Sequence, residues 1–225
     1  MKTRRDRALI LTSVATLLVA VALLPWAPAD AAVQCLKGRP VATGQTTCWD
    51  PTDITVPIAT IACAGTGQDG DIQAGKALSY LDLGNGTIRD RVTKLQWEKK
   101  SDDGTIHDKD TLYTWANAFA VHIAALNAGA GFAGHHDWRL PNVKELQSII
   151  DYENSFPAVA PAFNTGCAAS CTVLTCSCTA AAFYWSSSTN AFNPAFAWLV
   201  SFFDGFVDAG DKSLLGFVRA VRGGC

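Results

Sequence analysis

The chain has 225 residues, of which 49% are hydrophobic and 17% are charged, and its formal net charge is -2. This composition excludes wholesale disorder, and the near-neutral charge argues against the clustered positive charge that a nucleic-acid-binding surface needs. The length favours one domain of ordinary size with short extra segments.

The first 31 residues have the three-part pattern of a secretory signal peptide. A positive region comprises Lys2, Arg4, Arg5 and Arg7. Residues 8–24 then form an apolar run, and Ala29-x-Ala31 is a small-residue cleavage site. We therefore expect an exported protein in the periplasm, at the cell surface or outside the cell. The alternative is an uncleaved membrane anchor, which is the single route to a membrane that the sequence suggests.

The cysteines predict disulfide bonds, because an even number follows an export signal. We expect Cys48 to pair with Cys63 and Cys35 to join Cys225, while Cys176 and Cys178 each bond another cysteine. The spacing of the central four is dense enough for a metal site, but it lacks the separated Cys-x2-4-Cys pairs of zinc sites. The eight cysteines are Cys35, Cys48, Cys63, Cys167, Cys171, Cys176, Cys178 and Cys225.

The pattern along the chain predicts an irregular arm followed by one domain. Residues 32–77 are rich in Thr, Gly and Pro and form the cysteine-containing arm. Residues 78–225 form the domain, and residues 164–183 are a cysteine-rich insertion within it.

Within this domain, strands are expected at residues 87–90 and 95–98, joined by a bend. Thr114 is a candidate cap for a helix that runs to Leu126, and Asn142 with Glu145 begins a second helix after Pro141. Strand-like runs follow at residues 183–187, 196–203 and 215–221, with Asp204-Gly205 as a hairpin turn. This order predicts an α+β fold with two helices packed on short antiparallel strands.

An acidic loop is the one candidate metal site, and its ion would be Ca²⁺. Oxygen ligands on a flexible loop suit this ion, although the spacing does not fit an EF-hand. The alternative is a solvated acidic loop without a cofactor. The candidates are Asp102, Asp103, Asp108 and Asp110.

Aromatic residues bunch around the Asp204-Gly205 turn and suggest a ligand surface. Alternation along a strand buries one set of side chains and exposes the other. We take Trp198, Phe203 and Phe206 as the candidate surface, with core packing as the alternative for aromatic residues of this segment. The nearest approach to a basic patch is Lys94, Lys99 and Lys100.

Other polar residues point to packing rather than to catalysis. His122 lies on the apolar side of the first helix and is expected in the core with a hydrogen bond. His135 and His136 are adjacent, so their side chains point in different directions. The serines at positions 186–188 lack the Gly-x-Ser-x-Gly elbow of a nucleophile.

Several motifs together resemble one family. They are Gly84-Asn85-Gly86-Thr87-Ile88-x-Asp90, Leu95-x-Trp97, Tyr113-Thr114-Trp115-Ala116, Phe132-Ala133-Gly134-His135-x-Asp137-Trp138-Arg139-Leu140-Pro141-Asn142-x-Lys144-Glu145-Leu146, Tyr184-Trp185-Ser186-Ser187 and Val218-Arg219-Ala220-Val221-Arg222. This combination, from about residue 80 to residue 223, resembles the Lcl C-terminal domain family, long classed as a domain of unknown function.

The resemblance implies a bacterial surface or secreted protein with a compact fold akin to C-type-lectin-like and formylglycine-generating-enzyme-like domains. The member that gives the family its name is a collagen-like adhesin that is linked to sulfated polysaccharides. No Gly-x-y tract occurs in this chain. We expect structural roles for the motif residues, with Arg139 either paired to an acid or facing a ligand. They are Trp138, Arg139, Leu140, Pro141, Glu145, Trp185, Arg219 and Arg222.

Three functions follow as hypotheses. The first is a non-catalytic binding or adhesion module for glycans or a surface partner, without a cofactor. The second is a structural, disulfide-stabilised envelope protein with no dedicated ligand. The third is an enzyme of the formylglycine-generating type, against which the lack of two neighbouring cysteines in residues 217–224 argues.

Overall fold

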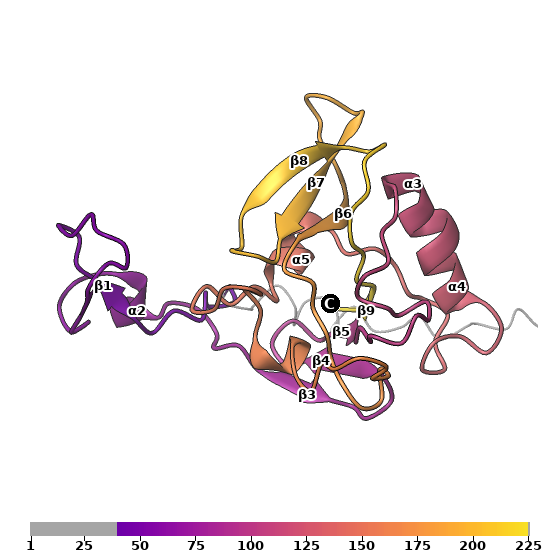
Figure 1. Cartoon of the computed structure of the whole chain (residues 1–225), viewed down its shortest axis with the longest axis horizontal. Helices are drawn as coiled ribbons and strands as arrows, with labels where there is room; N and C mark the ends of the chain where they lie inside the picture. Colours follow the sequence, from indigo (N-terminus) through magenta and orange to yellow (C-terminus); the bar gives the residue numbers. More distant parts are fainter. Residues whose placement is uncertain (1–39, 225) are drawn as a thin grey trace, which may run out of the picture.

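The computed structural model describes residues 40–224. It shows an arm at one side of a larger body made of two antiparallel sheets and several helices (Figure 1). The mixture of helices and antiparallel strands confirms the predicted α+β class. The predicted leader, Cys35 and Cys225 lie outside the described residues.

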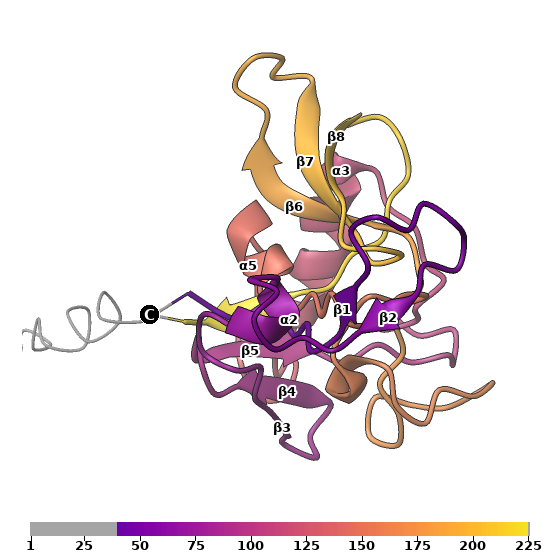
Figure 2. The ribbon, with the colours of Figure 1, turned by 90° about the vertical axis from the view of Figure 1, so that its left-hand side faces the viewer.

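The arm is built from very short elements that a disulfide holds together. Strands β1 (Cys48–Trp49) and β2 (Thr60–Ile61) pair in antiparallel fashion beside the single-turn helix α2 (Asp69–Ile72). The predicted Cys48–Cys63 bond closes this unit. A two-stranded pair is marginal by itself in water, so the bond supplies a constraint that the small core cannot. Figure 2 views the molecule from the side of this arm.

One sheet of the body has the order β3-β4-β5-β9, with antiparallel neighbours throughout. Its strands are β3 (Tyr80–Asp82), β4 (Thr87–Asp90), β5 (Leu95–Glu98) and β9 (Val221–Gly223). Both predicted central strands are confirmed. All four residues of β5 are buried, because this strand lies inside the molecule with neighbours on both of its edges.

The predicted first helix is a continuous helical segment with a wide middle turn. It comprises α3 (Trp115–Asn117), the π-helical η1 (Ala118–Ile123) and α4 (Ala124–Asn127). The Thr114 side chain accepts a hydrogen bond from the Asn117 amide, as its predicted capping role requires. The π-helical turn contains His122, which is buried. π-Helical turns within α-helices are frequently found at functional sites.

The second predicted helix is α5 (Val143–Gln147), and it begins with a complete capping box. The Asn142 side chain accepts from the amide of Glu145, and the Glu145 carboxylate accepts from the amide of Asn142. A 3₁₀ turn, η2 (Pro161–Phe163), precedes the cysteine-rich insertion.

The other sheet has the order β6-β7-β8, and one predicted strand is wrong. Its strands are β6 (Phe183–Thr189), β7 (Phe196–Ser201) and β8 (Val207–Asp211). Asp204-Gly205 forms the predicted turn between β7 and β8. The third strand is β8 rather than residues 215–221, which make isolated bridges at Gly216 and Phe217 before β9 begins. Gly and Asp within β8 weakened its sequence signal.

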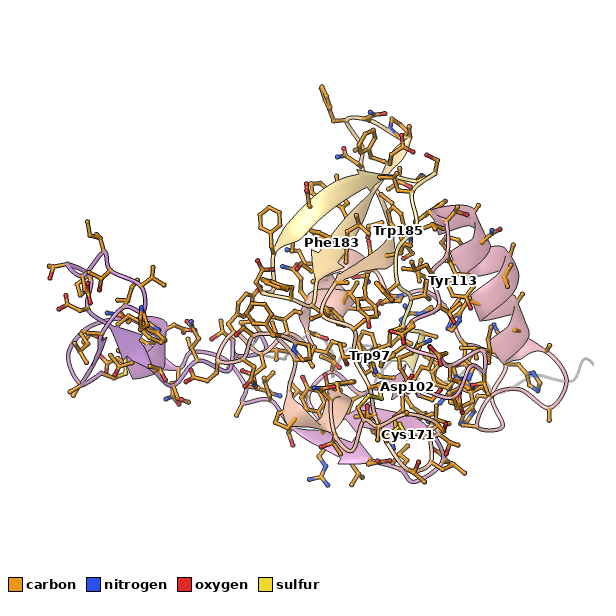
Figure 3. The ribbon with its side chains drawn as sticks, viewed as in Figure 1. Trp97, Asp102, Tyr113, Cys171, Phe183 and Trp185 are labelled. Carbon is orange, nitrogen blue, oxygen red and sulfur yellow. A yellow bond between two sulfur atoms is a disulfide. The ribbon has the colours of Figure 1, made fainter. Side chains whose placement is uncertain are left out.

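Two hydrophobic clusters form the core. One lies between the two sheets and α5 and includes Trp97, Leu146 and Tyr184. The other packs the long helical segment against Trp185 and Trp138. Figure 3 shows Trp97 and Trp185 inside the body. No helix within residues 40–224 is both long and apolar enough to span a membrane.

Two disulfides tie the insertion at residues 164–183. They join Cys167 to Cys178 and Cys171 to Cys176, so the prediction that Cys176 and Cys178 bond other cysteines is confirmed. All cysteines among the described residues are bonded, as is typical of proteins from oxidising compartments. The cysteine density therefore reflects cross-links rather than metal ligands.

Candidate ligand-binding surface

An aromatic patch lies at the turn between β7 and β8. Its members are Tyr152, Phe156, Phe203 and Phe206, with exposed fractions of 39%, 65%, 41% and 57%. The rings of Phe156 and Phe203 meet edge to face, with 3.9 Å between their centroids. Exposed aromatic groups at one place are a common feature of interaction surfaces. We call these four residues the aromatic patch.

Backbone hydrogen bonds position this patch. The amide of Gly205 donates to the Ser201 carbonyl at 2.9 Å, and the Ser201 amide donates to the Phe206 carbonyl at 2.7 Å. The Phe156 amide donates to the Phe203 carbonyl at 3.0 Å, which brings a separate loop beside the turn. The backbone that carries the patch is therefore fixed by hydrogen bonds within the fold.

Gly205 is required at this turn for two reasons. Its φ of 86° lies in the left-handed region, and a β-carbon there would lie 2.6 Å from a ring carbon of Tyr152. The Tyr152 hydroxyl donates to the Gly205 carbonyl at 3.3 Å. The tyrosine ring thus lies against the turn that carries Phe203 and Phe206.

The structure divides the aromatic residues that the sequence grouped together. Phe203 and Phe206 belong to the patch, whereas Phe202 is fully buried and stacks on Tyr184. Trp198 is half-buried on β7 opposite Ala209, three residues before the end of the strand. At about 3.4 Å per residue, this position lies well away from the turn. Trp198 is therefore not part of the aromatic patch.

A cluster of charged and titratable side chains lies in the interior of the domain, around Glu98. The Glu98 side chain has no exposure to solvent, and its Oε1 lies 2.8 Å from His107 Nδ1 and 3.3 Å from Lys100 Nζ. Its Oε2 lies 2.9 Å from His122 Nε2 and accepts from the Ala220 amide at the same distance. This network links β5 to the long helical segment and to the residues before β9.

Arg219 extends the buried network toward the cysteine-rich insertion. Its guanidinium is fully buried and donates to the Glu98 carbonyl at 2.9 Å. It also donates to the Cys178 carbonyl and to the Thr179 hydroxyl, both at 2.7 Å. These contacts connect segments far apart in sequence, so the predicted structural role of Arg219 is confirmed.

Burial sets the ionisation of His122. It lowers the pKa of His122 and outweighs the attraction of Glu98. Nδ1 of His122 is buried without a hydrogen-bond partner among residues 40–224, so a proton added there has no acceptor. Burial also disfavours the Glu98 carboxylate, but His122, Lys100 and His107 outweigh it and hold its pKa well below the ordinary range.

We expect stability to fall at acidic pH because of these two groups. The pKa of His122 is lower in the folded chain than its usual value of about 6.5. The neutral imidazole therefore contributes to the free energy of unfolding above a pH of about 6.5, and this stability is lost as the pH falls through the pKa of the folded state. Glu98 adds the same trend below about pH 4.5. Urea unfolding at a series of pH values measures this, and His122→Gln should reduce the slope whereas His136→Gln should not. A flat profile for the natural chain between neutral and mildly acidic pH would contradict the assignment.

The acidic loop brings together three of the four predicted Ca²⁺ ligands. Oxygens of Asp102, Asp108 and Asp110 lie within 4.8 Å of one another, but Asp103 instead accepts from Ser101 and Thr105. The ammonium of Lys109 lies 2.6 Å from Asp110 and 3.7 Å from Asp102. The chain thus provides its own cation at this loop. Figure 3 shows Asp102 near Cys171, whose carbonyl accepts from the Asp102 amide at 3.0 Å.

The predicted basic patch does not exist as a surface. Lys99 and Lys100 are each 2% exposed, and only Lys94 lies at the exterior. Lys99 pairs with Asp82 at 2.7 Å, and Lys100 pairs with Glu98. Both lysines follow a strand that the fold encloses, so their ammonium groups pair with acidic side chains of the same chain.

The histidine and serine runs have structural contacts. His122 is in the core with a hydrogen bond, as predicted. His136 Nδ1 lies 2.9 Å from the Asn127 carbonyl. Ser187 and Ser188 contact the segment that begins α5, through the Pro141 carbonyl and the Val143 amide. Ser186 donates to the Trp198 carbonyl at 2.7 Å.

The Trp-Arg-Leu-Pro motif forms the junction before α5. Trp138 and Leu140 are each 2% exposed, which confirms their predicted place in the core. Arg139 pairs through both terminal nitrogens with Glu145, at 2.7 and 2.6 Å, so it binds an acid of its own fold. The Glu145 carboxylate serves both this pair and the capping box.

The final motif residue, Arg222, joins β9 to this junction. It donates to Asp137 at 2.7 Å and to the Gln96 side chain at 2.6 Å. Trp185 is 1% exposed and donates from its indole nitrogen to the Tyr113 carbonyl at 3.0 Å. The motif residues at these positions thus hold separate segments together.

These motifs agree with a comparison to known families. The model of the Lcl C-terminal domain matches residues 86–222. The chain belongs to the Lcl C-terminal domain family. No match to the chain is found among curated proteins.

The Lcl C-terminal domain of this chain contains residues that sequence reasoning did not select. One of them is Glu98, the last residue of a short strand. No sequence motif predicts that its side chain is buried. Tyr152 and Phe156 lie in a polar segment after α5, and only the fold brings them beside the β7–β8 turn. The Phe156-Pro157 pair was the one available signal of a turn there.

Proposed function

We propose that this Lcl C-terminal domain is an exported, non-catalytic glycan-binding or adhesion module, and that the aromatic patch contacts the ligand. The single observation that carries this proposal is a group of four exposed aromatic side chains on the β7–β8 turn and on the loop that is hydrogen-bonded to it. Aromatic faces stack on sugar rings and need little ordering when the backbone is fixed. The disulfides agree with a location outside the cytoplasm.

The buried polar network supports a non-catalytic role. Its carboxylate, the Lys100 ammonium and the His122 imidazole are nearly inaccessible to solvent, so a substrate does not reach them without unfolding. A general acid or base must lie within hydrogen-bonding reach of the substrate. We assign this network to the stability of the domain. A C-type-lectin-like architecture, with ligands bound by loops on a rigid scaffold, is part of the same proposal.

The test is a glycan-array screen of the oxidised, exported chain, with calcium and again with EDTA. We expect binding that survives EDTA and falls about tenfold in the Phe203→Ala, Phe206→Ala double variant, as loss of about 1.4 kcal/mol of stacking predicts. Phe192→Ala is the matched control, because Phe192 is 98% exposed at the other end of the β6–β7 hairpin.

Each outcome of this screen has a defined meaning. Binding that EDTA abolishes would move the site to the acidic loop and overturn the role of the patch. Equal losses in the double variant and in Phe192→Ala would also overturn it. A folded protein that binds no glycan would contradict the proposal and favour the structural envelope role.

A further inference from the structure

A pocket of about 310 Å³ lies between the arm and the body, one residue away from the aromatic patch. Its wall combines arm residues such as Gln45 and Gln73 with Leu78 and Asp151 of the body. Asp151 is the only charged residue of this lining. The pocket is partly open to solvent, and amide and hydroxyl side chains contribute to its wall beside this single carboxylate. Small-molecule sites are likewise concave, with a few polar groups that orient the ligand.

Asp151 is built into the wall of the pocket. It is 9% exposed, and its carboxylate accepts from the Glu153 amide at 3.1 Å. A β-carbon on Gly44 would lie 2.2 Å from its Oδ1, so the close approach of the arm requires glycine at that position. Burial raises the pKa of Asp151, and hydrogen bonds from the Glu153 amide and the Asn154 side chain oppose this effect.

The pocket and the aromatic patch are linked through the backbone at residues 151–152. Tyr152 follows Asp151 directly, and its amide donates to the Thr43 carbonyl of the pocket wall at 2.8 Å. Glu153 then fixes the arm by accepting from the amides of Thr46 and Thr47. These contacts hold the arm side of the pocket against the segment that carries Tyr152.

The charges around this combined site are acidic. Asp151 lines the pocket, Glu153 follows Tyr152 in sequence, and the Phe206 amide donates to the Asp204 carboxylate. One base, Lys76, is exposed between the lining residues Gly75 and Ala77, and it does not itself line the pocket. An acidic site repels sulfate and carboxylate groups and attracts ammonium groups.

We infer that the pocket selects a glycan that bears a free ammonium group, with Asp151 binding that group while neighbouring sugar rings stack on the aromatic patch. This inference rests on the proposed function. The pocket is within the size range of small-ligand sites and provides side-chain amides and hydroxyls for the sugar hydroxyl groups. The ligand class is thus an amino sugar without an N-acetyl group.

The test compares three oligosaccharides of equal length by calorimetric titration of the full oxidised chain. They are a glucosamine oligomer, its fully N-acetylated counterpart and a sulfated heparin fragment, measured where amino groups are protonated. We expect the glucosamine oligomer to bind about tenfold more tightly than the N-acetylated one, since a hydrogen-bonded charge contributes this much. The heparin fragment should bind least.

Asp151→Asn removes the charge and keeps the oxygen that accepts from Glu153. It should cancel the preference for the free amine and leave binding of the N-acetylated oligomer unchanged. Asp211→Asn is the control, because Asp211 lies at the far end of β8 from the patch. If the Asp151 variant fails to fold, the preference of the natural chain still decides the question.

The two proposals fail in different ways. Equal binding of the free-amine and N-acetylated oligomers, reduced by the Phe203 and Phe206 substitutions, would overturn the role of the pocket and keep that of the patch. Tighter binding of heparin, or equal losses in Asp151→Asn and Asp211→Asn, would also overturn the pocket inference. Absence of binding by every oligomer would overturn the pocket inference, whereas the proposed function is decided by the glycan-array screen.

Discussion

Replacing Glu98 with Gln should destabilise the domain by about 3–5 kcal/mol, because breaking a buried ion pair leaves its partner uncompensated. The Lys100 ammonium would keep its buried position beside Arg219 without the carboxylate that now lies 3.3 Å away. An amide also donates hydrogens, so it cannot serve as acceptor for every donor around Glu98. Urea unfolding followed by circular dichroism measures the loss.

A matched control and a compensating variant separate charge burial from general disruption. Asp137→Asn changes a carboxylate in a surface pair with Arg222, and it should cost at most about 1 kcal/mol. Adding Lys100→Met to Glu98→Gln removes the stranded cation and should recover part of the lost stability. If Glu98→Gln costs no more than Asp137→Asn, the network does not carry the stability that we assign to it.

Replacing Trp185 with Ala should cost about 3–5 kcal/mol through the cavity that it leaves in the second core cluster. Its indole lies against Gly216, where a β-carbon would be 2.7 Å from the indole nitrogen. The Tyr113 carbonyl would keep a partner, since the Gly216 amide also donates to it at 2.9 Å. The loss is therefore one of packing rather than of hydrogen bonding.

The unfolding midpoint in urea tests this prediction, with Trp49→Ala as the control. Trp49 is 44% exposed on the arm, so its removal should shift the midpoint little. Trp185→Phe should lie between Trp185→Ala and the natural chain, because it fills part of the cavity. A Trp185→Ala midpoint equal to that of Trp49→Ala would contradict the placement of Trp185 in the core.

Features that depend on neighbouring residues could be predicted from the amino-acid sequence. The Asn142–Glu145 capping box, the Thr114 cap and the Asp204-Gly205 turn are set by atoms only a few positions apart, so residue type and spacing sufficed. The Cys48–Cys63 bond, with a sequence separation of 15, was predicted because it closes a small loop. The motifs also gave the family, because their combination is specific even where the role of each residue is not.

Which charged and aromatic side chains meet depends on contacts between distant segments, and these could not be predicted from the sequence. Lys99 and Lys100 looked like surface residues, yet the fold encloses the end of β5 and pairs them with Asp82 and Glu98. Phe156 and Phe203 are 47 positions apart and join one patch because a loop after α5 donates to the β7–β8 turn. Contacts of this range depend on chain topology, which local periodicity does not encode. Trp198 shows the converse, since closeness in sequence to the turn did not bring it to the patch.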